Sequence, residues 1–209
     1  MWIDEFSRVP DIRFLDEETV RIGNVRDFTW SGESYTKRWI TRTITRGDVE
    51  RAHVLCEHLR TSGTGHVFIC FETSLDPLCL SIEARRSHAR YSAVRGFFGA
   101  YELLYQYASA RDIIGKRLER KSDLDSCELI LDDDERWQLF VSLARAAERN
   151  ARDPERYHTL RRNCVTELFK HLPVDKTPLL PRTAGPLLVS IGRANPCDIF
   201  DAEHPPPFY

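Results

Sequence analysis

One cysteine of the chain stands where a nucleophile would be favoured. The stretch YHTLRRNCVTELFKHL, residues 157–172, has apolar residues at helical spacing, and Asn163 is a suitable N-cap for a helix that ends before Pro173. Cys164 then takes the first helical position, where the helix dipole and unpaired N–H groups favour a thiolate and could stabilise an oxyanion. This chemistry is attack on an acyl carbonyl. The alternative is a structural cysteine, because free cysteine often fills protein cores.

A cysteine nucleophile needs a base, and His66 is the best placed of the seven histidines. It begins the first strand of an expected hairpin, residues 66–86, which turns at SLDP. Alternation puts His66 on the same sheet face as Glu83 and Arg85, one of which is its cross-strand neighbour. A carboxylate on the ring nitrogen remote from the thiol would fix the tautomer and stabilise the imidazolium. The alternative is an ordinary cross-strand His–Glu pair.

The elements that must position these groups indicate an α+β fold. The spacing of apolar residues predicts a helix over 46–63, which would place His53 and His58 on a solvated helix face, and a helix over 133–151 capped by Asp132 or Asp133. Three further strands are expected over 101–109, 111–119 and 126–133. Their connections are too short for crossover helices, so the sheet should be antiparallel.

The composition excludes several classes of function. The 30 basic and 32 acidic side chains give a formal net charge of -2, so we expect no nucleic acid partner. The length of 209 residues favours one domain, residues 1–209, with an extended Pro-rich tail at about 204–209. No window approaches the ~18 consecutive apolar residues of a membrane span. No metal-ligand spacing is present and covalent thiol chemistry needs no cofactor, so we expect neither a metal nor a cofactor.

Cysteine spacing and basic clusters give weaker indications. The six cysteines show no spacing typical of a disulfide framework, so most are expected to be reduced. Two basic clusters could each bind a phosphate or a carboxylate, although a solvated surface is the default interpretation. Their members are Arg85, Arg86, Arg90 and Arg95 in one cluster, and Lys116, Arg117, Arg120 and Lys121 in the other.

The order of several motifs resembles one known family. GHVFICFE, LSIEARR, YSAVRGFFGAYELLYQYASARDIIGKRLER and PERYHTLRRNCVTEL follow one another as in the Lnb N-terminal periplasmic domain family. Its members carry a His that opens a strand, an S-x-E-x-R strand, a Y-E-x-x-Y segment and a final N-C motif. The family looks like a circularly permuted relative of the NlpC/P60 papain-like enzymes. The resemblance, which covers most of the chain, therefore implies an antiparallel sheet with packed helices in this permuted arrangement.

The resemblance also implies a role for each candidate residue. Cys164 would be the nucleophile, His66 its base and Glu83 the residue that orients the imidazole. We expect Asn163, Arg85 and Tyr157 to bind substrate. The enzyme after which this family is named N-acylates bacterial lipoproteins through a thioester. The expected function is therefore cysteine-dependent acyl transfer from an acyl-bearing substrate, which would be a lipid, a lipoprotein or a peptide.

Two alternatives stay open at this stage. An NlpC/P60-like amidase or peptidase would need a polar cleft, whereas an acyltransferase acting on lipids would need an apolar groove. A binding module would keep the fold without chemistry, and a sulfur within about 4 Å of an imidazole nitrogen would argue against it. The sequence leaves the oligomeric state open and leaves room for a membrane-bound partner. The compartment would be the periplasm or cell envelope if a leader or membrane segment is missing from this sequence, and the cytoplasm if it is complete.

Overall fold

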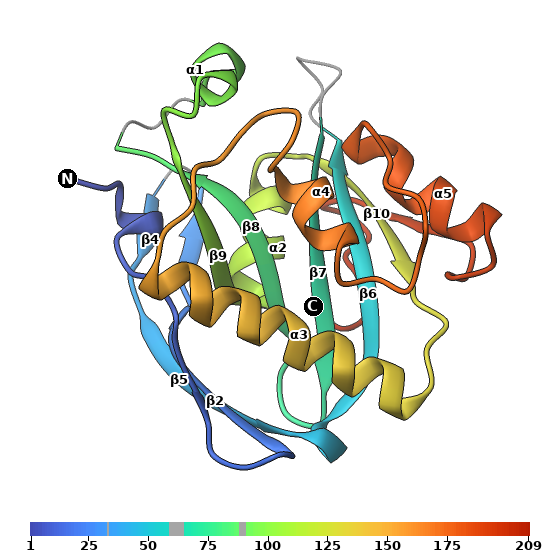
Figure 1. Ribbon diagram of the computed structural model, residues 1–209. Coiled ribbons are helices and arrows are strands. Elements are labelled where there is room, and N and C mark those ends of the chain that lie inside the picture. Colours follow the sequence, from blue (N-terminus) through green and yellow to red (C-terminus); the bar gives the residue numbers. More distant parts are fainter. Residues whose placement is uncertain (33, 59–64, 88–90) are drawn as a thin grey trace.

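A large sheet with helices on both of its faces forms the framework of the molecule (Figure 1). The computed structural model describes residues 1–209 except 33, 59–64 and 88–90. The strands are β1 Asp11–Phe14, β2 Thr19–Arg26, β3 Thr29–Ser31, β4 Ser34–Thr36, β5 Trp39–Thr45, β6 Val49–His58, β7 Gly65–Thr73, β8 Leu78–Arg85, β9 Glu102–Ser109, β10 Asp123–Glu128 and β11 Asp198–Phe200. The helices are α1 Ala93–Phe97, α2 Ala110–Glu119, α3 Asp133–Arg152, α4 Cys164–Phe169 and α5 Ala184–Ser190, with 3-10 turns η1 Asp4–Phe6, η2 Arg46–Asp48 and η3 Pro181–Thr183.

The strand order confirms an α+β fold and corrects the expected sheet. Nine of the described strands form one sheet in the order β1-β2-β9-β8-β7-β6-β10-β11, with β5 paired to β2. All of these neighbours are antiparallel except β2 and β9, which pair in parallel at Arg26 and Ala108. The sheet is therefore mixed and not purely antiparallel. Strands β3 and β4 form a separate hairpin.

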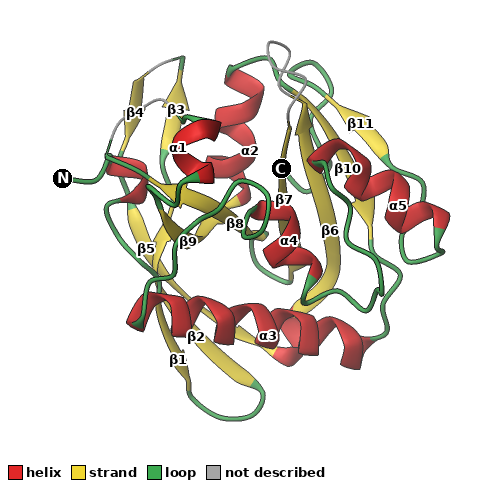
Figure 2. Ribbon diagram, turned by 45° about the horizontal axis from the view of Figure 1, so that its top comes forward, coloured by secondary structure: helices red, strands yellow, loops and turns green. Residues whose placement is uncertain are grey.

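Helices cover the two faces of the sheet unequally. On one face α3 packs on β1, β6 and β9, α4 packs on β7 and β8, and α5 packs on β6 and β10 (Figure 2). The other face carries α2, which packs on β8 and β9. The predicted α3 is confirmed, with Asp132 as its N-cap. Because both faces are covered, the central strands bury side chains on both sides, which gives two core clusters.

The hairpin of β7 and β8 is confirmed, and its register decides the neighbour of His66. Phe68 pairs with Ser81 and Cys70 with Cys79. The same register continued toward the start of β7 puts His66 opposite Glu83 and leaves Arg85 on the diagonal. The sequence had left these two possibilities open.

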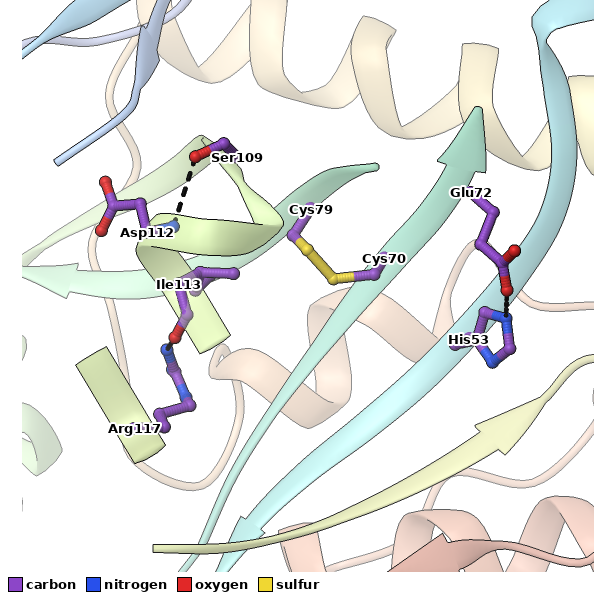
Figure 3. Close-up of a disulfide and its surroundings, with 8 residues drawn as sticks. All are labelled: His53, Cys70, Glu72, Cys79, Ser109, Asp112, Ile113 and Arg117. Atoms are coloured by element: carbon purple, nitrogen blue, oxygen red, sulfur yellow. Dashed lines mark hydrogen bonds and ion pairs between the residues drawn. A yellow bond between two sulfur atoms is a disulfide. The ribbon is translucent and has the colours of Figure 1, made fainter. Parts of the chain in front are cut away.

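The segment predicted as a helix over 46–63 is instead the central strand β6, and residues 59–63 lie outside the described part. The strand pairs with β7 on one side and β10 on the other. Both of its faces are buried, so it lacks the polar–apolar alternation of a half-exposed strand, and its apolar residues matched a helical stripe by chance. His53 and His58 are therefore not on a solvated helix; they bond Glu72 (Figure 3) and Asp125, each at 2.6 Å.

The segment predicted as a strand over 111–119 is helix α2. Ser109 caps it by accepting the N–H of Asp112 at 3.3 Å (Figure 3). Asp112 is fully buried and binds Arg26 at 2.8 Å, so a charged position faces inward. Such inward charges hide the polar–apolar pattern by which a helix is recognised. The predicted strand over 101–109 is confirmed as β9, while β10 begins and ends earlier than the predicted 126–133.

Four of the six cysteines form disulfides, which corrects the expectation that most are reduced. Cys70 and Cys79 join neighbouring strands of the hairpin (Figure 3). Cys127 of β10 is bonded to Cys197, just before β11, across a sequence separation of 70. A Cβ on Gly185 of α5 would lie 2.9 Å from the Cys197 sulfur, so α5 packs directly on this disulfide. Cys56 and Cys164 are free thiols.

The Pro-rich tail folds back onto the molecule at its end. Most of residues 204–209 are exposed, but Phe208 packs against the core cluster beneath α2, and its ring lies 4.6 Å from that of His53. None of the described helices has the length and apolar character needed to cross a membrane.

Candidate active site

The three candidate catalytic residues meet at one end of strands β7 and β8. Cys164 comes from the start of α4, His66 from the start of β7 and Glu83 from the end of β8. All three line a cavity of about 350 Å³. The fold thus brings together groups that are far apart in the sequence.

An N-terminal cap holds Cys164 in place and confirms the predicted start of α4. The Asn163 side chain accepts hydrogen bonds from the N–H groups of Val165 (2.9 Å) and Thr166 (3.0 Å), while the Asn163 N–H donates to the Thr166 hydroxyl at 2.9 Å. Helix α4 has only six residues, so its dipole contributes less to a thiolate than the sequence suggested. The groups that face the sulfur therefore matter more than the helix.

A hydrogen-bonded chain leads from His66 to Glu83 through Ser81. His66 Nε2 lies 2.6 Å from Ser81 Oγ, and Ser81 Oγ donates to Glu83 Oε1 at 2.7 Å. Glu83 Oε1 is also 3.3 Å from His66 Nε2. These contacts occupy Nε2, which leaves Nδ1 as the ring nitrogen available to the sulfur of Cys164.

The electrostatics of the site favour a thiolate–imidazolium pair. Burial alone would raise the pKa of Cys164, but the charge and hydrogen bond of His66, together with a hydrogen bond from the Val67 N–H, lower it. Burial would lower the pKa of His66, yet the charges of Glu83 and Cys164 raise it to about 10. The pKa of Glu83 lies well below its ordinary value because the charge of His66 outweighs the effect of burial.

A second carboxylate flanks His66 from the other side. Glu57 of β6 is the cross-strand partner of His66, and it binds Arg117 at 3.0 Å and accepts the Ser122 hydroxyl at 2.9 Å. Burial opposes ionisation of Glu57, but the charges of Arg117 and His66 lower its pKa. His66 therefore lies between two ionised carboxylates on the neighbouring strands, and the charge of Glu83 contributes most to keeping it protonated although it is mostly buried.

The inner wall of the cavity is made of buried ion pairs. Arg26 binds Asp112 at 2.8 Å and Glu5 at 3.6 Å, and Lys116 also binds Glu5. Burial lowers the pKa of Lys116 to about 8, although Glu5 acts in the opposite direction. Part of the second basic cluster is therefore a buried, ion-paired wall and not a solvated surface. Arg90 of the first cluster lies outside the described residues.

Two of the three expected substrate-binding residues line the cavity. Asn163 lines it, but its side-chain oxygen is committed to the cap of α4. Tyr157 is buried in the wall, where burial and then the charge of Cys164 raise its pKa. Arg85 does not line the cavity; its guanidinium donates to the Phe6 carbonyl at 2.9 Å.

Three groups of the site escaped the sequence analysis. Ser81 could have been found, because strand alternation places it on the same face as His66 and Glu83. Glu57 was missed because its segment was predicted to be a helix. The backbone N–H of Val67 carries no side-chain signal, since only the position of α4 brings the Cys164 sulfur to it.

The described residues contain no group of three or more His, Cys, Asp or Glu side chains arranged to hold a metal ion.

Comparison with known proteins assigns the chain to a family. Searches of curated proteins and of solved structures gave no match. The family model described as the Lnb N-terminal periplasmic domain matches residues 35–190, which is more than half of the chain and contains Cys164, His66 and Glu83. The chain therefore belongs to the Lnb N-terminal periplasmic domain family.

Proposed function

We propose that the protein is a cysteine-dependent acyl-transfer enzyme with Cys164 as nucleophile and His66 as acid and base. The observation that carries this proposal is that Cys164 and His66 line one cavity, with His66 paired to Glu83 at 3.3 Å. In this arrangement the pKa of the thiol is lowered and that of the imidazole is raised. A binding module would have no need for such a pair. The cavity in front of the sulfur provides room for an acyl group.

The proposed reaction has two steps. The Cys164 thiolate attacks the acyl carbonyl, and the backbone N–H of Cys164, which the cap does not use, donates to the oxyanion. His66 gives its proton to the leaving group, so a thioester remains on Cys164. An amine or water then attacks the thioester and gives its proton to His66. This releases the acyl product and restores the thiolate–imidazolium pair.

Glu83 and Ser81 would act on the imidazole without touching substrate. Glu83 stabilises the imidazolium, and Ser81 joins the carboxylate to Nε2. We further propose the circularly permuted NlpC/P60 arrangement, because His66 precedes Cys164 in the chain and Cys164 opens a helix packed on the sheet. Two disulfides suit an oxidising compartment, as does a family described as periplasmic.

The proposal can be tested by trapping the acyl-enzyme. The protein is mixed with a short-chain p-nitrophenyl ester, and intact-mass and peptide analysis locate the acyl group. We expect one acyl group on Cys164, none on the Cys164→Ala variant and slow acylation of the His66→Ala variant. The Cys56→Ala variant is the matched control and should react as the wild type does, since burial raises the pKa of Cys56 to about 12. Acylation that persists in Cys164→Ala would overturn the proposal.

A hydrolase acting on amides is the second candidate. The charged inner wall favours it, because Arg26, Lys116 and Glu5 could bind the polar groups of a peptide. Apolar side chains at the mouth, among them Leu160 and Leu180, favour an acyl chain. Adding an amine acceptor to the trapped thioester separates the two: transfer to the amine faster than to water supports the acyltransferase, and release only to water supports the hydrolase.

A further inference from the structure

Large apolar side chains gather at the mouth of the cavity and are exposed. Besides Tyr91, which lines the cavity, six of the fourteen exposed large apolar side chains that the structure describes belong to this one region. Single exposed apolar residues are ordinary, but a cluster around one opening marks a surface that is covered in use. We call this cluster the apolar rim, and its members are Val94, Phe97, Phe98, Leu160, Leu179 and Leu180.

The contacts of the rim show that it surrounds a single opening. Leu160, Leu179 and Leu180 line the cavity directly. Helix α1, which carries Phe97, is attached to the same opening. The Thr159 hydroxyl donates to the Ala93 carbonyl at 2.8 Å, and the Phe97 ring lies 5.1 Å from that of His158. Figure 1 shows α1 at the end of the sheet where β7 begins.

The charges near the apolar rim indicate the kind of surface to which it would bind. The segments 84–101, 156–166 and 176–197 contain every rim residue, and they hold ten of the 30 Lys and Arg residues but none of the 32 Asp and Glu residues. The remaining chain therefore carries 20 cations against 32 carboxylates. The carboxylates that line the cavity, Glu5, Glu57 and Glu83, are held in ion pairs with Lys116, Arg117 and His66. The exposed Arg161 and Arg182 therefore make the surface beside the apolar rim basic, and a basic, aromatic and Leu-rich surface matches an anionic lipid interface.

We propose that the apolar rim docks on the surface of an anionic lipid bilayer. Phe98, 78% exposed, and Leu179, 93% exposed, would enter the boundary between headgroups and acyl chains. Arg161 and Arg182, exposed in the same segments, would contact the anionic headgroups. Docking would turn the mouth of the cavity toward the lipid. This inference does not depend on the chemistry of Cys164.

Vesicle co-sedimentation tests the docking. The full chain is mixed with vesicles of phosphatidylcholine that contain about one third phosphatidylglycerol, and with vesicles of phosphatidylcholine alone. We expect binding to the anionic vesicles that weakens as salt is raised, and much weaker binding to the neutral ones. The Cys164→Ala variant should bind as the wild type does, so a failure of the proposed chemistry would not affect this result.

Matched variants separate the rim from the rest of the surface. The double variant Phe97→Ser/Phe98→Ser should lose about tenfold or more in partitioning, whereas Leu75→Ser/Ile199→Ser, which changes exposed apolar residues elsewhere, should not. The Arg161→Gln and Arg182→Gln variants should each partition onto the anionic vesicles about fivefold less than the wild type, whereas Arg13→Gln should partition as the wild type does. Circular dichroism verifies that each variant is folded.

Two outcomes would overturn the proposal. One is wild-type protein that binds neither kind of vesicle, or binds both equally at every salt concentration. The other is a dimer in sedimentation analysis that the Phe97→Ser/Phe98→Ser variant abolishes while vesicle binding is absent. The rim would then be an interface between copies of the chain.

Discussion

The thiol of Cys164 lies where burial and charge act on its pKa in opposite directions. Burial favours the neutral thiol, but His66 supplies both a positive charge and a hydrogen bond, and Val67 supplies an N–H. For the second free thiol, Cys56, burial and then the charges of Asp125, Cys164 and Glu57 raise the pKa to about 12. The two thiols are therefore an internal comparison of what a partnered imidazole does.

This comparison predicts which thiol reacts with iodoacetamide. In the wild type we expect alkylation of Cys164 well below pH 9 and none of Cys56. His66→Ala removes the imidazolium and leaves the burial, so the pKa of Cys164 should rise and its alkylation at pH 7 should slow by about tenfold or more. Site assignment by mass spectrometry over a pH series measures both. Unchanged alkylation in His66→Ala would mean that the imidazole does not activate the sulfur.

Glu83 is expected to set the alkaline limit of activity. Its charge helps to raise the pKa of His66 from 6.5 to about 10, so the imidazolium persists until the pH passes that value. Glu83→Gln removes this charge, and the alkaline limb of the rate profile should move to lower pH. Ser81→Ala keeps the ion pair at 3.3 Å, so its shift should be smaller. A larger shift in Ser81→Ala would assign the main effect to the hydroxyl.

The same groups give a sign for the pH dependence of stability. The raised pKa of His66 stabilises the folded state below pH 6.5, and this contribution is lost as the pH rises through about 10. The lowered pKa of Glu83 stabilises the folded state above its unfolded value of 4.5, and this contribution is lost as the pH falls through the folded value. The free energy of unfolding should therefore differ most between wild type and Glu83→Gln in the neutral range. A constant difference from acid to pH 11 would contradict this.

At the scale of the residue, the sequence was sufficient for the groups that lie on regular positions. Cys164 follows a good N-cap, and His66 and Glu83 share a strand face, so periodicity places them, whereas their proposed roles came from the family resemblance. Glu57 enters the site from β6, which has no readable alternation because both of its faces are buried. Local periodicity therefore cannot predict site residues, such as Glu57, that lie on a strand buried on both faces.

Among the elements, the cap of α4 is expected to control both stability and reactivity. Asn163→Ala leaves two N–H groups of a six-residue helix without their acceptor, which should cost about 1 kcal/mol in the free energy of unfolding. It should also move Cys164 away from His66 and slow its alkylation. Urea unfolding and the alkylation rate measure the two effects.

The matching control for this prediction is the cap of another helix. Asp132 caps α3 through the N–H of Glu135 at 2.8 Å, far from the thiol in the chain. Asp132→Ala should lower stability by a similar amount and leave the alkylation of Cys164 unchanged. If both variants slow alkylation equally, the effect is general loss of stability and not positioning by the cap.

The two mispredicted elements fail for opposite physical reasons. Strand β6 is apolar on both faces, so its apolar residues also fit the spacing of a helical stripe. Helix α2 turns the charged Asp112, Lys116 and Arg117 inward, so its sequence shows no regular polar–apolar pattern. In α2 these charges are satisfied by Arg26, Glu5 and Glu57, which come from distant parts of the chain. Local patterns cannot report such partners, so the α+β class was predictable while the central strand order was not.

For the whole molecule, the two disulfides are expected to contribute unequally to the free energy of unfolding. The Cys127–Cys197 disulfide joins residues with a sequence separation of 70 and holds β11 beside β10. The Cys70–Cys79 disulfide joins residues of one hairpin with a sequence separation of only 9. If a disulfide acts mainly by restricting the unfolded chain, the longer loop contributes about 4 kcal/mol and the shorter about 2.5 kcal/mol to the free energy of unfolding. The longer one also secures the edge of the sheet next to β6, from which Glu57 reaches His66.

Removing each disulfide should therefore have different consequences. Peptide mapping without reduction should find the two linkages and free thiols at Cys56 and Cys164. In urea, the variant Cys127→Ala/Cys197→Ala should lose more stability than Cys70→Ala/Cys79→Ala. Equal losses would show that native-state packing outweighs loop closure, and six free thiols in protein from an oxidising compartment would contradict the linkages. Because β10 lies beside β6, loosening the Cys127–Cys197 edge should also slow alkylation of Cys164, whereas loosening the hairpin linkage at the far end of β7 should affect it less.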